Sequence, residues 1–211
     1  RKEINLFAER MRRMFGMLKT LLHETNENEF NKLFSRIEKY ENISDSMELE
    51  IANYLNKVSE GRLSSESKLE IRGMLREVTE IESIGDSCYN LARTINRKRS
   101  GGNDFTEKQY EHIHQMMQLT DDALAQMIAI VEDDYHVVDV NKTFNLENEI
   151  NNYRAQLKNQ NVVDVNNKEY DYQMGVHYMD LIGECEKLGD YVVNVVEART
   201  NVKEKKTGDN R

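Results

Sequence analysis

Apolar residues recur three and four positions apart along almost the whole chain, and no stretch alternates apolar and polar residues between turn pairs. This spacing puts apolar side chains on one face of an α-helix, whereas a strand would need a period of two. Proline, which breaks helices and marks sharp turns, is absent from all 211 residues. The sequence therefore predicts an all-α protein built from long helices, with enough residues to bury a core.

Capping residues and polar breaks divide this pattern into six helices. Ser64 or Ser65 can cap the third helix, and Thr106 with Gln109 matches a capping box at the start of the fourth. The clearest linker is Ser100 to Asp104, which contains two consecutive glycines. We expect helices over residues 4–23, 29–59, 65–99, 106–131, 140–158 and 170–200, followed by a polar, disordered tail over residues 201–211.

The second half of the chain repeats the first. Residues 48–54 match residues 147–153 at five of seven positions, and residues 80–90 match residues 184–194 at five of eleven. The offset grows from 99 to 104 between these matches, which one insertion in a loop over residues 160–168 would explain. The repeat predicts two tandem three-helix bundles, over residues 1–100 and 104–200, related by an approximate twofold or a translation and sharing or extending one core.

Charge and composition exclude several classes of function. The net charge of −9 argues against a nucleic-acid partner, which would require basic residues that neutralise phosphates. Only residues 1–22 are basic, with six Lys or Arg against two Glu. No window is apolar enough for a membrane span or a signal peptide, so we expect a soluble chain. The start at Arg1, without a capping residue, fits a fragment of a longer protein.

The two cysteines, Cys88 and Cys185, suggest neither a disulfide framework nor a zinc site. Neither belongs to a Cys-x-x-Cys motif or a Cys/His cluster, and both fall in helical pattern. We expect small buried thiols in a reducing compartment.

Pairs of carboxylates four residues apart recur in the repeat. Glu82 and Asp86 occupy the same repeat positions as Glu186 and Asp190, each pair within a Glu-x-Glu-x-x-Gly-Asp context. Spacing of four stacks both side chains on one helix face, where like charges repel and a cation between them would remove the repulsion. A single pair of this kind usually marks a solvent-exposed helix face. Two pairs at equivalent positions of the repeat favour a carboxylate metal site.

The second helix offers a third pair of this form, Glu41 and Asp45. Its counterparts in the second repeat are Val140 and Phe144, so that repeat lacks the pair. We therefore expect the first repeat to bind metal better than the second, or neither repeat to be occupied in a purified fragment. The glycines at the shared positions, Gly85 and Gly189, are unfavourable within a helix, and we expect them to permit a close approach by a neighbouring helix.

Glu111 and His114 carry an alternative hypothesis. Their Glu-x-x-His spacing occurs in di-iron carboxylate bundles, which need two such motifs and further Glu ligands from other helices. The first helix has no His at the corresponding position. No phosphate-binding Gly loop, nucleophile elbow or Cys/His dyad is present, so nucleotide, hydrolase and thiol chemistry lack the residues they need.

The two recurring stretches, residues 80–93 and 184–195, resemble the paired signatures of the PhoU family. The resemblance covers essentially residues 1–200 and implies tandem three-helix bundles. Residues 40–55 and 85–90 are more similar to the cytoplasmic C-terminal domain of bacterial sodium/phosphate cotransporters than to the free-standing regulator. The basic start agrees, because Lys and Arg concentrate in cytoplasmic segments near membrane helices.

The resemblance implies a non-catalytic regulatory domain of a sodium-dependent phosphate transporter, on the cytoplasmic side of the bacterial inner membrane. Its partner would be the transmembrane portion of the same chain, a homodimer is left open, and neither nucleic acid nor a small-molecule substrate is expected. It also implies bound metal, with Fe, Zn, Mn and Mg not distinguished. The alternatives are a free-standing PhoU-type phosphate-signalling regulator and a carboxylate-bridged di-metal oxidase. Carried over to this sequence, the metal ligands would be Glu41, Asp45, Glu82, Asp86, Glu186 and Asp190.

Overall fold

A computed structural model describes residues 1–133 and 137–201, and every regular element in these two ranges is an α-helix. This confirms the predicted all-α class. None of the helices in the described part of the chain is long and apolar enough to span a bilayer. The six helices are α1 (Lys2–His23), α2 (Glu27–Ser59), α3 (Ser65–Ser100), α4 (Glu107–Glu132), α5 (Asn141–Asn166) and α6 (Tyr172–Thr200).

Side-chain caps define the helix starts where the sequence predicted them. The hydroxyl of Ser64 accepts a hydrogen bond from the backbone N–H of Ser67, and Thr106 with Gln109 forms the expected capping box of α4. At the other end of the chain, Asn201 ends α6 in the left-handed conformation, with φ of 55°. Residues 202–211 of the predicted tail lie outside the described residues.

Helix α5 is longer than predicted. It continues to Asn166 instead of ending near Lys158, because the sequence between them contains neither Gly nor Pro to stop it. An i,i+4 hydrogen bond from Gln160 Nε2 to Asp164 Oδ1, 2.9 Å long, spans this stretch. Most of the insertion that separates the two repeats therefore lies in a helix, and the prediction that it forms a loop is wrong.

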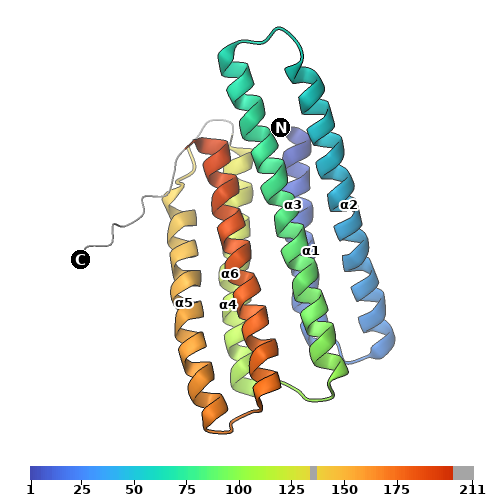
Figure 1. The fold of residues 1–211 in the computed structure, drawn as a ribbon, viewed down its shortest axis with the longest axis vertical. Helices are drawn as coiled ribbons and strands as arrows, with labels where there is room; N and C mark the ends of the chain where they lie inside the picture. Colours follow the sequence, from blue (N-terminus) through green and yellow to red (C-terminus); the bar gives the residue numbers. More distant parts are fainter. Residues whose placement is uncertain (134–136, 202–211) are drawn as a thin grey trace, which may run out of the picture.

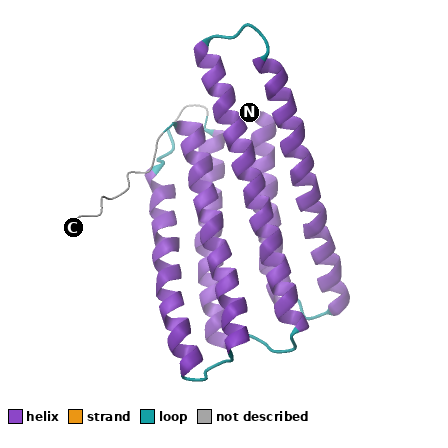
Figure 2. Cartoon of the chain, viewed as in Figure 1, coloured by secondary structure: helices purple, strands orange, loops and turns teal. Residues whose placement is uncertain are grey.

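The two halves of the chain form antiparallel three-helix bundles that lie side by side (Figure 1). Helices α1 and α3 of the first bundle pack against α4 and α6 of the second. Helix α2 flanks the first pair at one edge of the molecule, and α5 flanks the second pair at the other edge, as Figure 2 also shows. The four central helices therefore carry the interface between the repeats.

The repeats are related by an approximate twofold rather than by a translation. Asn90 Nδ2 of α3 donates to Glu184 Oε1 of α6 over 3.3 Å, and Asn194 Nδ2 of α6 donates to Glu80 Oε2 of α3 over 3.1 Å. Asn90 is equivalent to Asn194 in the repeat, and Glu80 is equivalent to Glu184. The operation that superposes one repeat on the other therefore converts each hydrogen bond into the other. Such an exchange requires α3 and α6 to run antiparallel, as they do in Figure 1.

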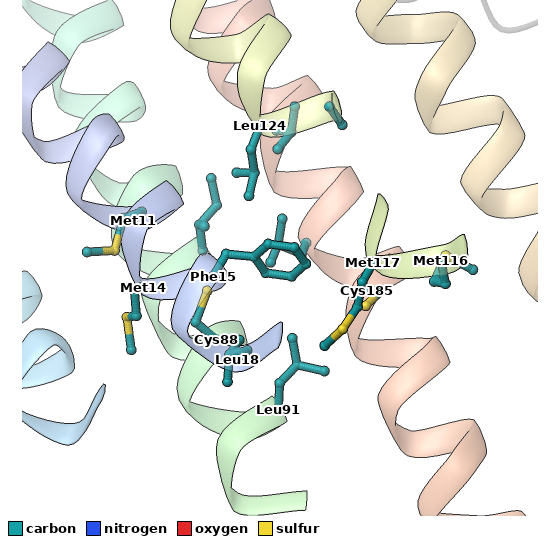
Figure 3. Packing of buried hydrophobic residues seen from close by; sticks show 14 of the residues in the cluster. Met11, Met14, Phe15, Leu18, Cys88, Leu91, Met116, Met117, Leu124 and Cys185 are labelled. Atoms are coloured by element: carbon teal, nitrogen blue, oxygen red, sulfur yellow. The ribbon is translucent and has the colours of Figure 1, made fainter. Parts of the chain in front are cut away.

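One apolar core runs through both bundles. Figure 3 shows its centre, where side chains of α1 and α3 meet those of α4 and α6. Both cysteines are fully buried and free, and burial raises the pKa of the Cys185 thiol to about 12. The prediction of buried thiols is confirmed. The labelled side chains at this centre are Met11, Met14, Phe15, Leu18, Cys88, Leu91, Met116, Met117, Leu124 and Cys185.

A buried ion pair joins four helices near the end of the interface where α1 begins and α6 ends. Arg199 of α6 donates to both carboxylate oxygens of Glu77 on α3, over 2.9 and 2.7 Å, and to the carbonyl oxygen of Val131 in α4 over 2.8 Å. The side-chain amide of Asn5 in α1 donates to the same carbonyl oxygen over 3.1 Å. Glu77 and Arg199 are each only 2% exposed at the side chain. Sequence analysis missed this pair, because its members lie 122 positions apart.

The two repeat glycines differ in what surrounds them. A Cβ on Gly85 would lie 2.8 Å from Ser44 Oγ of α2 and 2.9 Å from Met11 Sδ of α1, so α2 passes very close to α3 here. A Cβ on Gly189 would meet Ile150 Cδ1 of α5 at 3.4 Å, which is an ordinary contact. The expected close approach is therefore tight at Gly85 only.

We expect Gly85→Ala to lower the free energy of unfolding by about 1–3 kcal/mol, because the new methyl group overpacks the contact with Ser44 and Met11. Gly189→Ala should be neutral or stabilising by up to about 1 kcal/mol, because Ala favours the helix and has room. Denaturant unfolding of both variants checks this. Equal effects at the two positions would contradict the difference in packing.

Candidate metal site between α2 and α3

Three carboxylates from two helices converge beside Gly85. Glu41 and Asp45 stack one turn apart on α2, and Asp86 faces them from α3. One oxygen from each of the three lies within 4.8 Å of the others. The close approach at Gly85 explains this convergence, since Ser44 precedes Asp45 and Gly85 precedes Asp86 in the chain.

Glu82 extends this group by one turn of α3. Its carboxyl group is close enough to that of Asp86 for the two to interact electrostatically. Burial raises the pKa of Glu82 to about 8, with further contributions from Asp86, Glu48 and Asp45. Burial also raises the pKa of Glu41, followed by the charges of Asp45 and Asp86. We call Glu41, Asp45, Glu82 and Asp86 the acidic cluster.

The raised pKa values describe a group of carboxylates whose burial and mutual repulsion outweigh the one compensating charge that acts on Glu41, that of Arg93. A proton on Glu82 reduces the repulsion at neutral pH, and a dication would do so more fully. Carboxylate oxygens are hard ligands that suit Mg²⁺, Ca²⁺, Mn²⁺ and iron. The converging oxygens of Glu41, Asp45 and Asp86 therefore fit the metal ion that the sequence predicts. These three residues would hold it, with Glu82 one turn away as a further ligand.

Glu48 is a contributor that the sequence-based ligand set omits. It is half-buried on α2 and raises the pKa of Glu82 through its charge. The signal was present in the repeat, where Glu48 matches Glu147. The helical pattern alone did not indicate that Glu48 turns toward α3 rather than toward solvent.

The described residues of the second repeat do not assemble an equivalent cluster. Glu186 of α6 forms an ion pair with Arg154 of α5, with 2.5 Å between Oε2 and Nε, and Asp190 is exposed. At the positions of Glu41 and Asp45 stand Val140, just before α5, and Phe144, which is buried. In this repeat a guanidinium supplies the positive charge beside Glu186. Glu186 and Asp190 belong to no group of three converging ligand atoms among the described residues, so their ligand role stays a prediction.

The Glu111-x-x-His114 motif does not form a di-metal centre in the described part of the chain. Nε2 of His114 instead faces Nε2 of His23 at the end of α1. Among the described residues, Glu41, Asp45 and Asp86 are the one group of three or more His, Cys, Asp or Glu side chains whose ligand atoms converge. The four-carboxylate, two-histidine arrangement of the oxidase hypothesis is not assembled in these residues.

The pKa of Glu82 predicts a pH dependence of stability in metal-free protein. Its folded pKa of about 8 lies above the ordinary value of 4.5 for a glutamate, so the folded state holds an extra proton between these two values. The stability associated with this proton is fully present below about 4.5 and is lost as pH rises through about 8. Thermal unfolding of chelated protein should therefore show a melting temperature that falls over this range.

The variant Glu82→Gln should flatten that fall, because an amide does not titrate. Glu50→Gln, which changes an exposed carboxylate on α2, serves as the matched control and should leave the slope unchanged. Parallel pH profiles for wild type and Glu82→Gln would contradict the raised pKa.

Comparison with known proteins agrees with this architecture. The profile of the PhoU domain matches residues 4–95 and residues 113–198, once in each repeat. The fold is similar to that of the phosphate transport system regulatory protein PhoU from Streptococcus pneumoniae, with a TM-score of 0.75 and 14% sequence identity. That likeness covers 97% of this chain and 95% of the pneumococcal chain. A search of curated proteins found no significant match.

Proposed function

The chain belongs to the PhoU family, and on this premise we propose that it is a non-catalytic regulator of phosphate transport. The observation that carries the proposal is the match of the PhoU domain to both repeats, which together make up most of the chain. PhoU regulatory proteins are non-catalytic. The pneumococcal protein with a similar fold is described as a regulator of a phosphate transport system.

The regulator could be a free-standing protein or a domain of a transporter, and the free-standing form has the better support. The fold is shared with 95% of the pneumococcal regulator, and both its repeats have counterparts here. The domain of a sodium/phosphate cotransporter is the second candidate, favoured by the sequence similarity of residues 40–55 and by the basic residues 1–22. In both forms the partner would be a membrane transporter of phosphate, and the protein would act in the cytoplasm.

The acidic cluster would serve this role as a structural cation site. Glu41 and Asp45 belong to α2, whereas Glu82 and Asp86 belong to α3, so one cation held by these residues would link the two helices. Asp45 and Asp86 are exposed, so the charge of this surface would depend on the bound ion. A regulator without catalytic groups acts through such surfaces, because its effect depends on what its surface binds.

Measurement of phosphate uptake tests the proposed function. Deletion of the gene should alter uptake of labelled phosphate in phosphate-replete cells, and the wild-type gene should restore it. The variant with Glu82→Gln and Asp86→Asn separates the role of the cluster from that of the fold. Unchanged uptake and unchanged expression of phosphate-starvation genes after deletion would overturn the proposal.

The sequence of the gene upstream of Arg1 distinguishes the two forms. Several membrane spans encoded there would support the cotransporter domain. A start codon directly before Arg1 would support the free-standing regulator.

A further inference from the structure

Two histidines from different repeats face each other at the lower end of the molecule in Figure 1, where α1 ends and α4 begins. His23 is the last residue of α1, and His114 lies in the first half of α4. Their Nε2 atoms lie within hydrogen-bonding distance, with the ring centroids 4.6 Å apart and the ring planes tilted by 52°. Both side chains are exposed, so ions in solution can reach them.

The facing nitrogens make this pair a pre-arranged set of metal ligands. When the hydrogen of each neutral imidazole is on Nδ1, the two Nε2 atoms carry lone pairs that are directed at one point. Burial lowers the pKa of His23, and the neighbouring His114 and Lys98 lower it further. The lowered pKa favours the uncharged imidazole, which is the form that binds metals.

The surroundings hold the two rings in place. The ring of Tyr110 packs against both histidines, with centroid distances of 5.3 Å to His23 and 6.4 Å to His114. Lys98 is neutralised by Asp104, with 2.5 Å between Nζ and Oδ1, and Tyr110 donates to the same oxygen over 2.6 Å. The carboxyl end of α1, with its partial negative charge, lies at His23 and favours a cation there.

Space for further ligands is present beside His23. A cavity of about 370 Å³ is lined by His23, Lys98, Asp104 and Tyr110, together with residues of α2 and α3. Water molecules in it could complete the coordination of an ion that the two imidazoles hold. Imidazole nitrogen suits Zn²⁺, Cu²⁺ and Ni²⁺, whereas the oxygens of the acidic cluster suit harder ions.

We propose that His23 and His114 form a second metal site, which binds a transition-metal dication such as Zn²⁺, Ni²⁺ or Cu²⁺ between α1 and α4. This site joins the two repeats, whereas the acidic cluster lies within the first repeat. The proposal goes beyond the proposed function and does not depend on it, because it rests on the geometry of the two rings.

Calorimetric titration with Ni²⁺ tests the site. The protein is the full chain without a histidine tag, in a background of Glu82→Gln and Asp86→Asn, with excess Mg²⁺ present to occupy any remaining oxygen sites. We expect one Ni²⁺ per chain. His114→Gln and, separately, His23→Gln should weaken binding by at least tenfold, because loss of even an outer-sphere partner of a metal site costs about ten- to a hundredfold.

His112→Gln is the matched control on α4. Nδ1 of His112 bonds to the hydroxyl of Tyr178 in α6 over 2.8 Å, so this residue belongs to a different contact and its loss should leave Ni²⁺ binding unchanged. Helix content and melting temperature of each variant verify that it folds. Absence of Ni²⁺ binding in the parent protein, or equal affinity in His114→Gln, would overturn the proposal.

Electron paramagnetic resonance of bound Cu²⁺ provides a readout that does not depend on affinity. The parent protein should show hyperfine coupling to two imidazole nitrogens, and His114→Gln should show coupling to one. Coupling to a single nitrogen in the parent protein would also overturn the proposal.

Discussion

Replacement of Arg199 by Met lowers the free energy of unfolding by about 3–5 kcal/mol. The substitution leaves Glu77 in the interior without its partner and leaves the carbonyl of Val131 without the donor of its 2.8 Å bond. Burial already raises the pKa of Glu77 despite the attraction of Arg199, so its charge is costly to keep in the interior. Denaturant unfolding at neutral pH measures the loss.

The exposed ion pair Arg76–Glu197 provides the matched control, because it joins the same two helices, α3 and α6. Arg76 is 45% exposed at the side chain, so Arg76→Ala should cost less than about 1 kcal/mol. The double variant Glu77→Leu, Arg199→Met should regain much of the loss, because it leaves no buried carboxylate unpaired. A small effect of Arg199→Met alone would show that Glu77 is accommodated as a neutral acid.

Addition of a divalent cation to chelated protein should stabilise it through the acidic cluster. An ion that binds only the folded state adds about 2.7 kcal/mol at one hundred times its dissociation constant. The variant Glu82→Gln, Asp86→Asn should lose this gain, because amides bind cations less well than carboxylates do. Melting temperatures with Mn²⁺ or Mg²⁺ against chelator, together with elemental analysis of untagged protein, measure it.

The second repeat supplies the control for this experiment. Glu186→Gln, Asp190→Asn changes the equivalent positions, where Arg154 already balances Glu186, and should retain the metal-dependent stabilisation. Equal stability of wild-type protein with chelator and with metal, together with no bound metal in elemental analysis, would contradict the metal site. The acidic cluster would then be a group of solvent-exposed carboxylates between α2 and α3.

Local pattern within the sequence was sufficient for the helices, apart from the end of α5, and for the repeat. Spacing of three and four, the cap at Ser64 and the capping box at Thr106 involve residues within one or two turns of each other, so they are readable from the chain itself. The pair Glu82 and Asp86 was found in the same way. Its recurrence as Glu186 and Asp190 identified the repeat but did not distinguish the environments of the two pairs.

Tertiary structure decided which of these charges meet and what they meet. Asp86 joins Glu41 and Asp45 because α2 passes close to Gly85, whereas Glu186 meets Arg154 instead. Periodicity specifies which face of a helix is apolar, but not which residues of another helix lie opposite that face. The contacts of Glu77 with Arg199 and of His23 with His114 span 122 and 91 positions, and they exist only because packing of the apolar faces set the angle and register of the helices.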